Sequence, residues 1–459
     1  MDFILNFEDE DQLSQDRLLK NEIPYYRNYQ GFSSPKGLSA YNVKTIIDSK
    51  GNYINEIRVE NNSEEEDMLL ASNSVNESHP KHLVMIHGYG ASCGWFYKNL
   101  HGLICANPNS KIHALDLLGF GLSSRPEIKY EHDTSSEANL DIIYDQSEVV
   151  KNIPKTSNEK KRKNKKTFAT PKHFKVRSQD VLKYIKNQRD LVDEVEGTYV
   201  DSLEKWRLNN GIEKFDLLGH SLGGYLAVAY CLKYPNHVKR LVLVSPGGVE
   251  RSPFSVTNPR YLALQKLSED RTDTIPEYLE SVTSHWPGDY SFLGRYTSVK
   301  ESFKLIWQTR TSFFAMLRWM GPLGPKKLSE RNISRLTRSG YFNDWKEIDL
   351  FIKYIYNTGL KSSFSETSIM RIFDASVVAK YPLLDRIDKL QVPKSLWIYG
   401  EHDFMFTDCG HAAVNKLNSK PGFEAKFDLV SNAGHNLYLD NYKEFNQKVL
   451  RFLGWHEAR

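Results

Sequence analysis

The sequence has few cysteines and no long apolar run, and both absences restrict what the protein can be. Its four cysteines, among 459 residues, lie far apart and without paired spacing. This pattern predicts neither a disulfide framework nor a zinc site, and it favours a reduced intracellular compartment. No stretch reaches the roughly 18 apolar residues of a transmembrane helix, so none is expected. Residues 1–11 are acidic, unlike a secretory signal or a mitochondrial presequence.

The chain also lacks a large excess of either charge, but its charges are unevenly distributed. It has 61 Lys and Arg, 57 Asp and Glu, and a formal net charge of +4. Acidic residues gather in 127–148 and basic residues in 151–177. Because such blocks stay solvated, we predict a charged, disordered insertion at 127–176. Two roles of the basic stretch remain open, contact with anionic lipid headgroups and nuclear targeting through residues 160–166; no nucleic-acid partner is expected.

Strand and helix patterns alternate along most of the chain. After a hairpin, strands are expected at 83–86, 112–116, 215–218, 240–245, 394–399 and 425–430; the hairpin itself joins 41–48 and 53–60. Helices are expected at 95–103, 179–209, 225–234, 410–417 and 442–453. This alternation predicts an α/β fold with a mostly parallel central sheet and helices on both faces.

The alternation stops between residues 250 and 375, where aromatic residues and helical patterns prevail. We therefore divide the chain into an N-terminal arm (1–40), a first half of the core (41–249, with the charged insertion), a helical cap (250–380) and a second half of the core (381–459). A cap inserted after the strand at 240–245 is expected to cover the carboxyl ends of the strands, where ligands bind in such sheets.

Residues 219–223 read Gly-His-Ser-Leu-Gly and stand between a predicted strand and a predicted helix. Gly-x-Ser-x-Gly at such a junction is typical of a nucleophile elbow. Glycines flank the serine because Cβ atoms there would collide with neighbouring backbone in so tight a turn. The turn exposes the hydroxyl of Ser221 above the sheet. It also places the N–H of Leu222 at a helix N-terminus, where negative charge is stabilised.

A serine nucleophile needs a base to accept its proton and a third group to orient that base. In folds with this elbow, the chain order is serine, acid, histidine. His435 lies late in the chain, in a loop before the last helix, and we predict that it is the base. Asp403 is predicted as the acid because Gly400 ends the preceding strand and Asp403 lies on the next turn. Asp408 and Glu401 remain alternatives.

Acyl transfer also needs two N–H donors for the negatively charged oxygen of the intermediate, a pair called the oxyanion hole. Leu222 is one predicted donor. Tyr89, in the turn His-Gly-Tyr-Gly at 87–90 after an early strand, is the other. The glycine-rich segment 116–126 follows the next strand. It lacks the helix and acidic residue of a nucleotide-binding fingerprint, so we interpret it as a structural loop beside the site.

With these residues assembled, the chain resembles the α/β-hydrolase superfamily. More narrowly, it resembles the fungal group of cardiolipin-specific deacylases and lysophosphatidate acyltransferases, which is related to animal α/β-hydrolase-domain lipid proteins. The matching segments are His-Gly-Tyr-Gly-Ala-Ser at 87–92, Gly-His-Ser-Leu-Gly-Gly-Tyr at 219–225, Trp-Met-Gly-Pro-Leu-Gly-Pro at 319–325 and Gly-His-Asn-Leu-Tyr-Leu-Asp-Asn at 434–441. One departure is Phe-Met-Phe at 404–406, where the family has Trp-Met-Asp.

The resemblance implies a serine-dependent phospholipid acyl-ester hydrolase, of cardiolipin type or a related glycerophospholipid deacylase, that works through an acyl-enzyme. One alternative is a lysophosphatidic acid acyltransferase with acyl-CoA as co-substrate, in which His435 and Asp440 form the His-x-x-x-x-Asp motif. Asp440 alternatively just favours the start of the last helix. A non-catalytic lipid regulator is the other alternative. No cofactor and no metal are expected, and the resemblance favours a peripheral protein at a lipid surface, mitochondrial or cytoplasmic.

Overall fold

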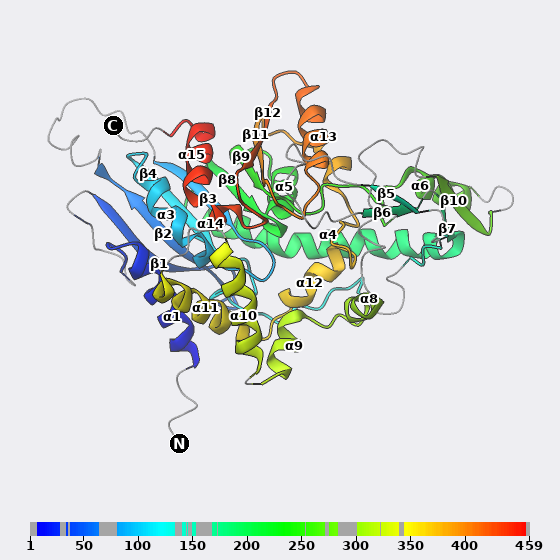
Figure 1. Cartoon of the computed structure of the whole chain (residues 1–459). Coiled ribbons are helices and arrows are strands. Elements are labelled where there is room, and N and C mark those ends of the chain that lie inside the picture. The colour runs from blue at the N-terminus through cyan, green and yellow to red at the C-terminus, as the bar shows by residue number, and fades with distance from the viewer. Residues whose placement is uncertain are drawn as a thin grey trace.

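The computed structural model describes residues 7–27, 34, 37–63, 80–133, 140–143, 145, 149–152, 168–171, 173–252, 254–270, 275–282, 301–321, 323–338 and 344–455. Within this part of the chain, eight strands form a central sheet in the order β1-β2-β4-β3-β8-β9-β11-β12 (Figure 1). They are β1 (Leu38–Ile46), β2 (Tyr53–Asn61), β3 (Lys81–Ile86), β4 (Ser110–Leu115), β8 (Phe215–His220), β9 (Val238–Val244), β11 (Lys394–Gly400) and β12 (Glu424–Val430).

The sheet is mostly parallel, as predicted. From β4 to β12 neighbouring strands run parallel, whereas β1 and β2 form an antiparallel hairpin and β2 pairs antiparallel with β4. The hairpin turn contains Gly51 at φ +79°, a conformation that glycine adopts without strain. The first strand begins at Leu38, slightly before the predicted residue 41.

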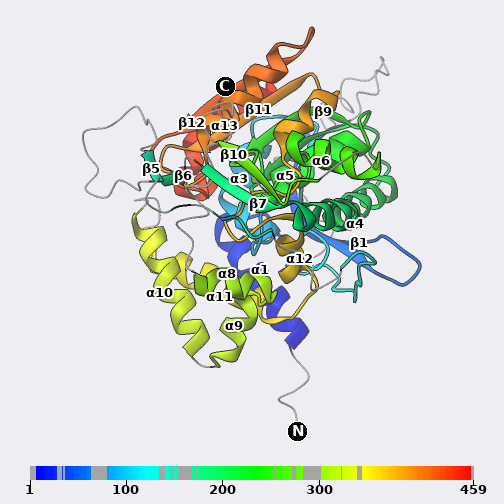
Figure 2. The ribbon, with the colours of Figure 1, turned by 90° about the vertical axis from the view of Figure 1, so that its right-hand side faces the viewer.

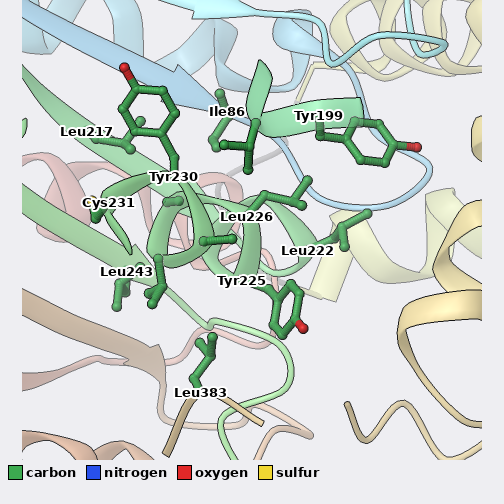
Figure 3. Packing of buried hydrophobic residues seen from close by; sticks show 14 of the residues in the cluster. Ile86, Tyr199, Leu217, Leu222, Tyr225, Leu226, Tyr230, Cys231, Leu243 and Leu383 are labelled. Atoms are coloured by element: carbon green, nitrogen blue, oxygen red, sulfur yellow. The ribbon is translucent and has the colours of Figure 1, made fainter. Parts of the chain in front are cut away.

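Alternate side chains of the parallel strands enter two cores, one on each face of the sheet. In β3, Leu83 and Met85 pack into the core with α3 and α15, whereas Val84 and Ile86 pack into the core with α4 and α5. Figure 3 shows Leu226 of α5 within this second core. The helices that cover the two faces are α3 (Tyr97–Ile104), α4 (Ser178–Asn209), α5 (Leu222–Lys233), α13 (Thr407–Asn418), α14 (Leu437–Asp440) and α15 (Tyr442–Leu453).

The cap lies between β9 and β11 in the sequence. Its helices are α6 (Pro259–Glu269), α8 (Glu301–Gln308), α9 (Phe313–Trp319), α10 (Leu323–Arg338), α11 (Trp345–Leu360) and α12 (Ser365–Ile372). Helices α8 to α11 lie together at one end of the molecule, away from α13 (Figures 1 and 2). The N-terminal arm contains α1 (Phe7–Glu22), which packs on α11. No helix in the described ranges is long and apolar enough to cross a bilayer.

Both ends of the segment 127–176 differ from the predicted disorder. Near its start, Leu140 and Ile142 are buried. At its end, β7 (His173–Arg177) pairs antiparallel with β10 (Tyr278–Val282) of the cap. Phe174 and Val176 alternate with charged residues along β7, so one face of this strand is buried and the other is exposed. An interpretation based on composition counts the charged residues but not their alternation with buried ones, so it did not predict this short strand.

The middle of that segment is only partly described. β5 (Val149–Asn152) pairs antiparallel with β6 (Phe168–Pro171). Residues 153–167, which include the lysine-rich run at 160–166, lie outside the described residues. The predicted roles of the basic stretch 151–177 in lipid contact or nuclear targeting therefore stay predictions.

Candidate active site

Ser221 lies in the sharp turn between β8 and α5. Its backbone has φ +53° and ψ −115°, which is unusual for a residue with a side chain and marks a strained position. A Cβ on Gly219 would overlap the backbone oxygen of Gly223, and a Cβ on Gly223 would lie 2.5 Å from the backbone oxygen of His87. Only glycine therefore fits at these two positions, which gives the predicted steric reason for the motif.

A continuous chain of hydrogen bonds joins Ser221, His435 and Asp403. The Oγ of Ser221 lies 3.0 Å from Nε2 of His435, and Nδ1 of His435 lies 3.0 Å from Oδ1 of Asp403. An ionised carboxylate only accepts, so Nδ1 carries the ring proton and Nε2 is left to accept from the serine hydroxyl. The imidazole is thus in the tautomer that can take a proton from Ser221.

Asp403 is the carboxylate that contacts the histidine. Its side chain is fully buried, and Oδ1 also accepts the N–H of Met405 at 3.0 Å. Burial alone would raise the pKa of Asp403, but the interaction with His435 and further hydrogen bonds hold it below its usual value. Of the two alternatives, Glu401 accepts the N–H of Asn432 at 3.0 Å instead. Asp408 is exposed in the first turn of α13.

Two residues around His435 escaped the sequence analysis. His220 is buried, and its Nε2 donates to the backbone oxygen of His435 at 3.0 Å. Burial, followed by the neighbouring His435, lowers the pKa of His220 well below its usual value, so this ring stays neutral. The ring of Phe404 packs against the imidazole of His435, with ring centroids 4.4 Å apart. In the sequence, only the position of His220 directly before Ser221 points to its contact with His435.

The turn at 87–90 packs against the elbow. A Cβ on Gly88 would lie 2.9 Å from Cβ of Ser221, so the turn can approach the nucleophile only without a side chain there. The hydroxyl of Tyr89 donates to the backbone oxygen of Glu366 at 2.6 Å. The side chain of Tyr89 is therefore held by the cap, and its predicted contribution to the oxyanion hole is restricted to its backbone N–H.

His87 is a structural member of this turn. It is buried, its Nδ1 donates to the oxygen of Gly88 at 2.8 Å, and its Nε2 accepts the N–H of Leu117 at 3.0 Å. Both ring nitrogens are thus used, and burial lowers the pKa of His87. The histidine ties the turn to the glycine-rich loop 116–126, which lies beside the site.

Asp116 organises that loop from within. Its buried carboxylate accepts the N–H groups of Cys93 at 2.6 Å and Leu122 at 2.8 Å and the side-chain amide of Asn55 at 2.8 Å. A Cβ on Gly121 would overlap the carboxylate of Asp116. The glycines of this loop therefore permit a close turn around Asp116, and the loop lines the site without entering its chemistry.

Asp440 lies at the end of α14, five residues after His435 in the sequence. Its Oδ2 accepts the N–H of Gly434, the residue before His435, at 2.9 Å. The next residue, Asn441, caps α15 through its side chain, which accepts the N–H of Glu444. Asp440 is thus placed to hold the loop that carries the histidine, whereas the capping role belongs to Asn441.

A cavity lies between the cap and the turn at 87–90. Its lining includes Gly90, Phe120, Arg125 and Phe314. The ring of Phe314, from α9, would lie 3.0 Å from a Cβ on Gly90. The cap therefore covers the turn at 87–90, and the cavity is lined by apolar rings together with the charged residues Arg125, Lys361 and Glu366.

Comparisons with known proteins agree with this architecture. Protein ECM18 of Saccharomyces cerevisiae is 29% identical over 81% of this chain and 70% of its own length. The 1-acylglycerol-3-phosphate O-acyltransferase ICT1 of the same yeast is 26% identical over 81% of each chain. The human 1-acylglycerol-3-phosphate O-acyltransferase ABHD5 is 27% identical over 82% of this chain and 78% of its own length.

These relatives agree with the lipid-protein group that the sequence motifs resemble. The family model for the alpha/beta hydrolase fold matches residues 81–442, which is most of the chain. The eight-stranded sheet of the described residues and the elbow at the end of β8 fit that match. This protein belongs to the alpha/beta hydrolase fold family.

Proposed function

We propose that this protein is a serine-dependent hydrolase of acyl esters in glycerophospholipids, with cardiolipin as one candidate substrate. The observation that carries the proposal is the chain of hydrogen bonds from Ser221 through His435 to Asp403, built on a serine with positive φ. A serine hydroxyl in this setting becomes a nucleophile because the neighbouring base removes its proton during attack.

The proposed reaction uses these three side chains in turn. Oγ of Ser221 attacks the ester carbonyl carbon while Nε2 of His435 takes the hydroxyl proton, and Asp403 stabilises the resulting imidazolium. The backbone N–H groups of Leu222 and Tyr89 donate to the oxyanion. As the intermediate collapses, the carbon–oxygen bond to the glycerol breaks, and His435 gives its proton to the departing lysophospholipid. Water, activated by the same histidine, then attacks the acyl-enzyme and releases the fatty acid.

A lipid substrate is supported by the relatives rather than by the catalytic residues, which suit any ester. ICT1 and ABHD5 are named for an activity on 1-acylglycerol-3-phosphate. The cavity between the cap and the turn at 87–90 adds little to this argument, because its lining holds Arg125, Lys361 and Glu366 besides the rings of Phe120 and Phe314.

The names of the same relatives favour a second candidate function, acyl transfer to lysophosphatidate. In this version the hydroxyl of a lysophospholipid replaces water in the second step, and the acyl group comes from acyl-CoA or from a phospholipid. Asp440 is compatible with both versions, because its carboxylate accepts the N–H of Gly434 in the loop of His435, which both reactions need.

The test is a partition experiment with the purified protein. A phospholipid or acyl-CoA with a labelled acyl chain is supplied with unlabelled lysophosphatidate, and the label is followed into fatty acid and phosphatidate. Label in fatty acid supports the hydrolase, label in phosphatidate supports the transferase, and Ser221→Ala should abolish both products. Neither product from the wild type, or equal product from Ser221→Ala, would contradict the proposal and favour a non-catalytic regulator.

A further inference from the structure

The turn between α9 and α10 exposes three large apolar side chains, which together we call the cap tip. Trp319 is 75% exposed, Leu323 is 59% exposed and Met320 is 39% exposed. Single exposed apolar residues are common, but a group of them on one turn marks an interaction surface. The cap tip lies within the segment at 319–325.

Glycines in that motif create the tip. Gly321 has φ +52°, and the N–H of Gly324 donates to the oxygen of Gly321 at 3.0 Å, so the chain makes a tight turn between the two helices. A Cβ on Gly324 would overlap the backbone oxygen of Leu317. The two helices therefore meet closely at their ends, and Trp319 and Leu323 stay mostly exposed beside the turn.

Another apolar face of the same two helices packs against the protein core. Leu317 of α9, and Leu328 and Ile333 of α10, pack against the core that includes α11. Leu328 is only 7% exposed. The cap tip therefore lies apart from the side chains by which these helices pack on the core, Leu317, Leu328 and Ile333.

Positive charge borders the cap tip. Lys326 and Lys327 are exposed in the first turns of α10. Lys327 has a surface pair with Glu330 at 3.2 Å, and a pair this exposed contributes little. Apolar side chains beside exposed lysines suit the interface of an anionic membrane, where the rings enter the headgroup region and the ammonium groups meet phosphates.

Helix α9 also connects the cap tip with the candidate active site. The ring of Phe314 lies close to Gly90 in the turn at 87–90. Arg318 makes two hydrogen bonds to the carboxylate of Glu366, at 2.7 and 2.8 Å, and the backbone oxygen of Glu366 accepts the hydroxyl of Tyr89. One short helix therefore has its exposed end at the tip and its inner face over the site.

We propose that the cap tip inserts into the surface of an anionic phospholipid membrane, with Trp319 and Leu323 in the headgroup and upper acyl region and Lys326 and Lys327 at lipid phosphates. The inference rests on the proposed function only in taking the substrate to be a membrane lipid. The binding step itself does not need Ser221.

The experiment is flotation of the full chain with vesicles of phosphatidylcholine, with or without phosphatidylglycerol. The paired change Trp319→Ser and Leu323→Ser should weaken vesicle binding by roughly tenfold or more, because it removes most of the inserted apolar area. Lys326→Gln with Lys327→Gln should remove the preference for phosphatidylglycerol. The matched control is Trp345→Ser, since Trp345 is 65% exposed at the start of α11, and it should bind as the wild type does.

Trp319→Phe guards against a folding artefact. This variant keeps an apolar ring and should still float, but it should lose much of the tryptophan quenching caused by brominated lipids. Ser221→Ala should float like the wild type, so a failed hydrolase assay and a failed membrane assay are separate results. Equal flotation of the wild type and the paired Trp319 and Leu323 variant would overturn the proposal. So would loss of a dimer, rather than of vesicle binding, in that variant.

Discussion

The α/β core and the cap hold their distinctive side chains in opposite ways. In the core, Ser221 lies in a turn that only glycine neighbours permit, and His435 is held by contacts on several sides. In the cap, Trp319 and Leu323 lie at a turn and face solvent. The contrast fits the two proposed roles, because a nucleophile must be positioned before its substrate arrives, whereas a surface proposed to enter a membrane must stay exposed in the free protein.

The largest expected effect lies in the core and concerns Asp403. Asp403→Asn should lower kcat for a water-soluble ester by about 10⁴-fold, because an amide favours the wrong tautomer of His435. Asp408→Asn is the control, since Asp408 is exposed and lies on the same segment. Steady-state kinetics measure both. A similar loss in the two variants would mean that Asp403 has no special part in orienting the base.

Two glycines sharpen the comparison between core and cap. Gly219→Ala should lower ester hydrolysis by about 100-fold, because a Cβ there overlaps Gly223 and must move the nucleophile. Gly321→Ala has open space around its Cβ and only a positive φ, so it should cost about 1–2 kcal/mol of stability and leave ester hydrolysis unchanged. Enzyme kinetics and chemical denaturation of both variants test this prediction. Full activity of Gly219→Ala together with loss of activity in Gly321→Ala would contradict it.

Asp440 is expected to have an intermediate effect. Asp440→Ala removes the acceptor for the N–H of Gly434 and should lower kcat by about tenfold, because the loop that carries His435 is then held less precisely. Asp440→Asn keeps an acceptor oxygen and should retain most of the activity. Assays of hydrolysis and of acyl transfer should show the same order of variants. If Asp440→Asn lost transfer alone, the carboxylate would have a chemical role in transfer.

The smallest expected effect separates the two regions by stability. Trp319→Ser should change the free energy of unfolding by less than about 0.5 kcal/mol, because the side chain is mostly exposed. Leu226→Ala, in the core around α5, should cost about 2–5 kcal/mol. Urea denaturation measures both values. A large loss of stability in Trp319→Ser would show that this ring packs against the protein and is not held ready for a membrane.

Much of the core follows from the sequence because its signals are local. The elbow at 219–223, the strand that ends at Gly400 and the loop at His435 each show themselves within a few residues. The order of serine, acid and histidine then joins them, and the structure places the three side chains in hydrogen-bond contact.

Features that depend on contacts between distant segments could not be predicted from the sequence. The contact of His220 with the backbone of His435 joins residues far apart in the chain. The pairing of β7 with β10 likewise joins the end of the charged segment to the cap, and no local pattern announces a partner. The motif at 319–325 can be recognised in the sequence. The exposure of Trp319, Met320 and Leu323 became clear only from the way α9 and α10 pack.

The most direct test of the account is covalent labelling with a fluorophosphonate, read by mass spectrometry of the intact protein and its peptides. The account predicts one adduct on the wild type, located on Ser221, with none on Ser221→Ala and much slower labelling of His435→Ala. An adduct on another residue, or equal labelling of the wild type and Ser221→Ala, would contradict the claim that Ser221 is the nucleophile.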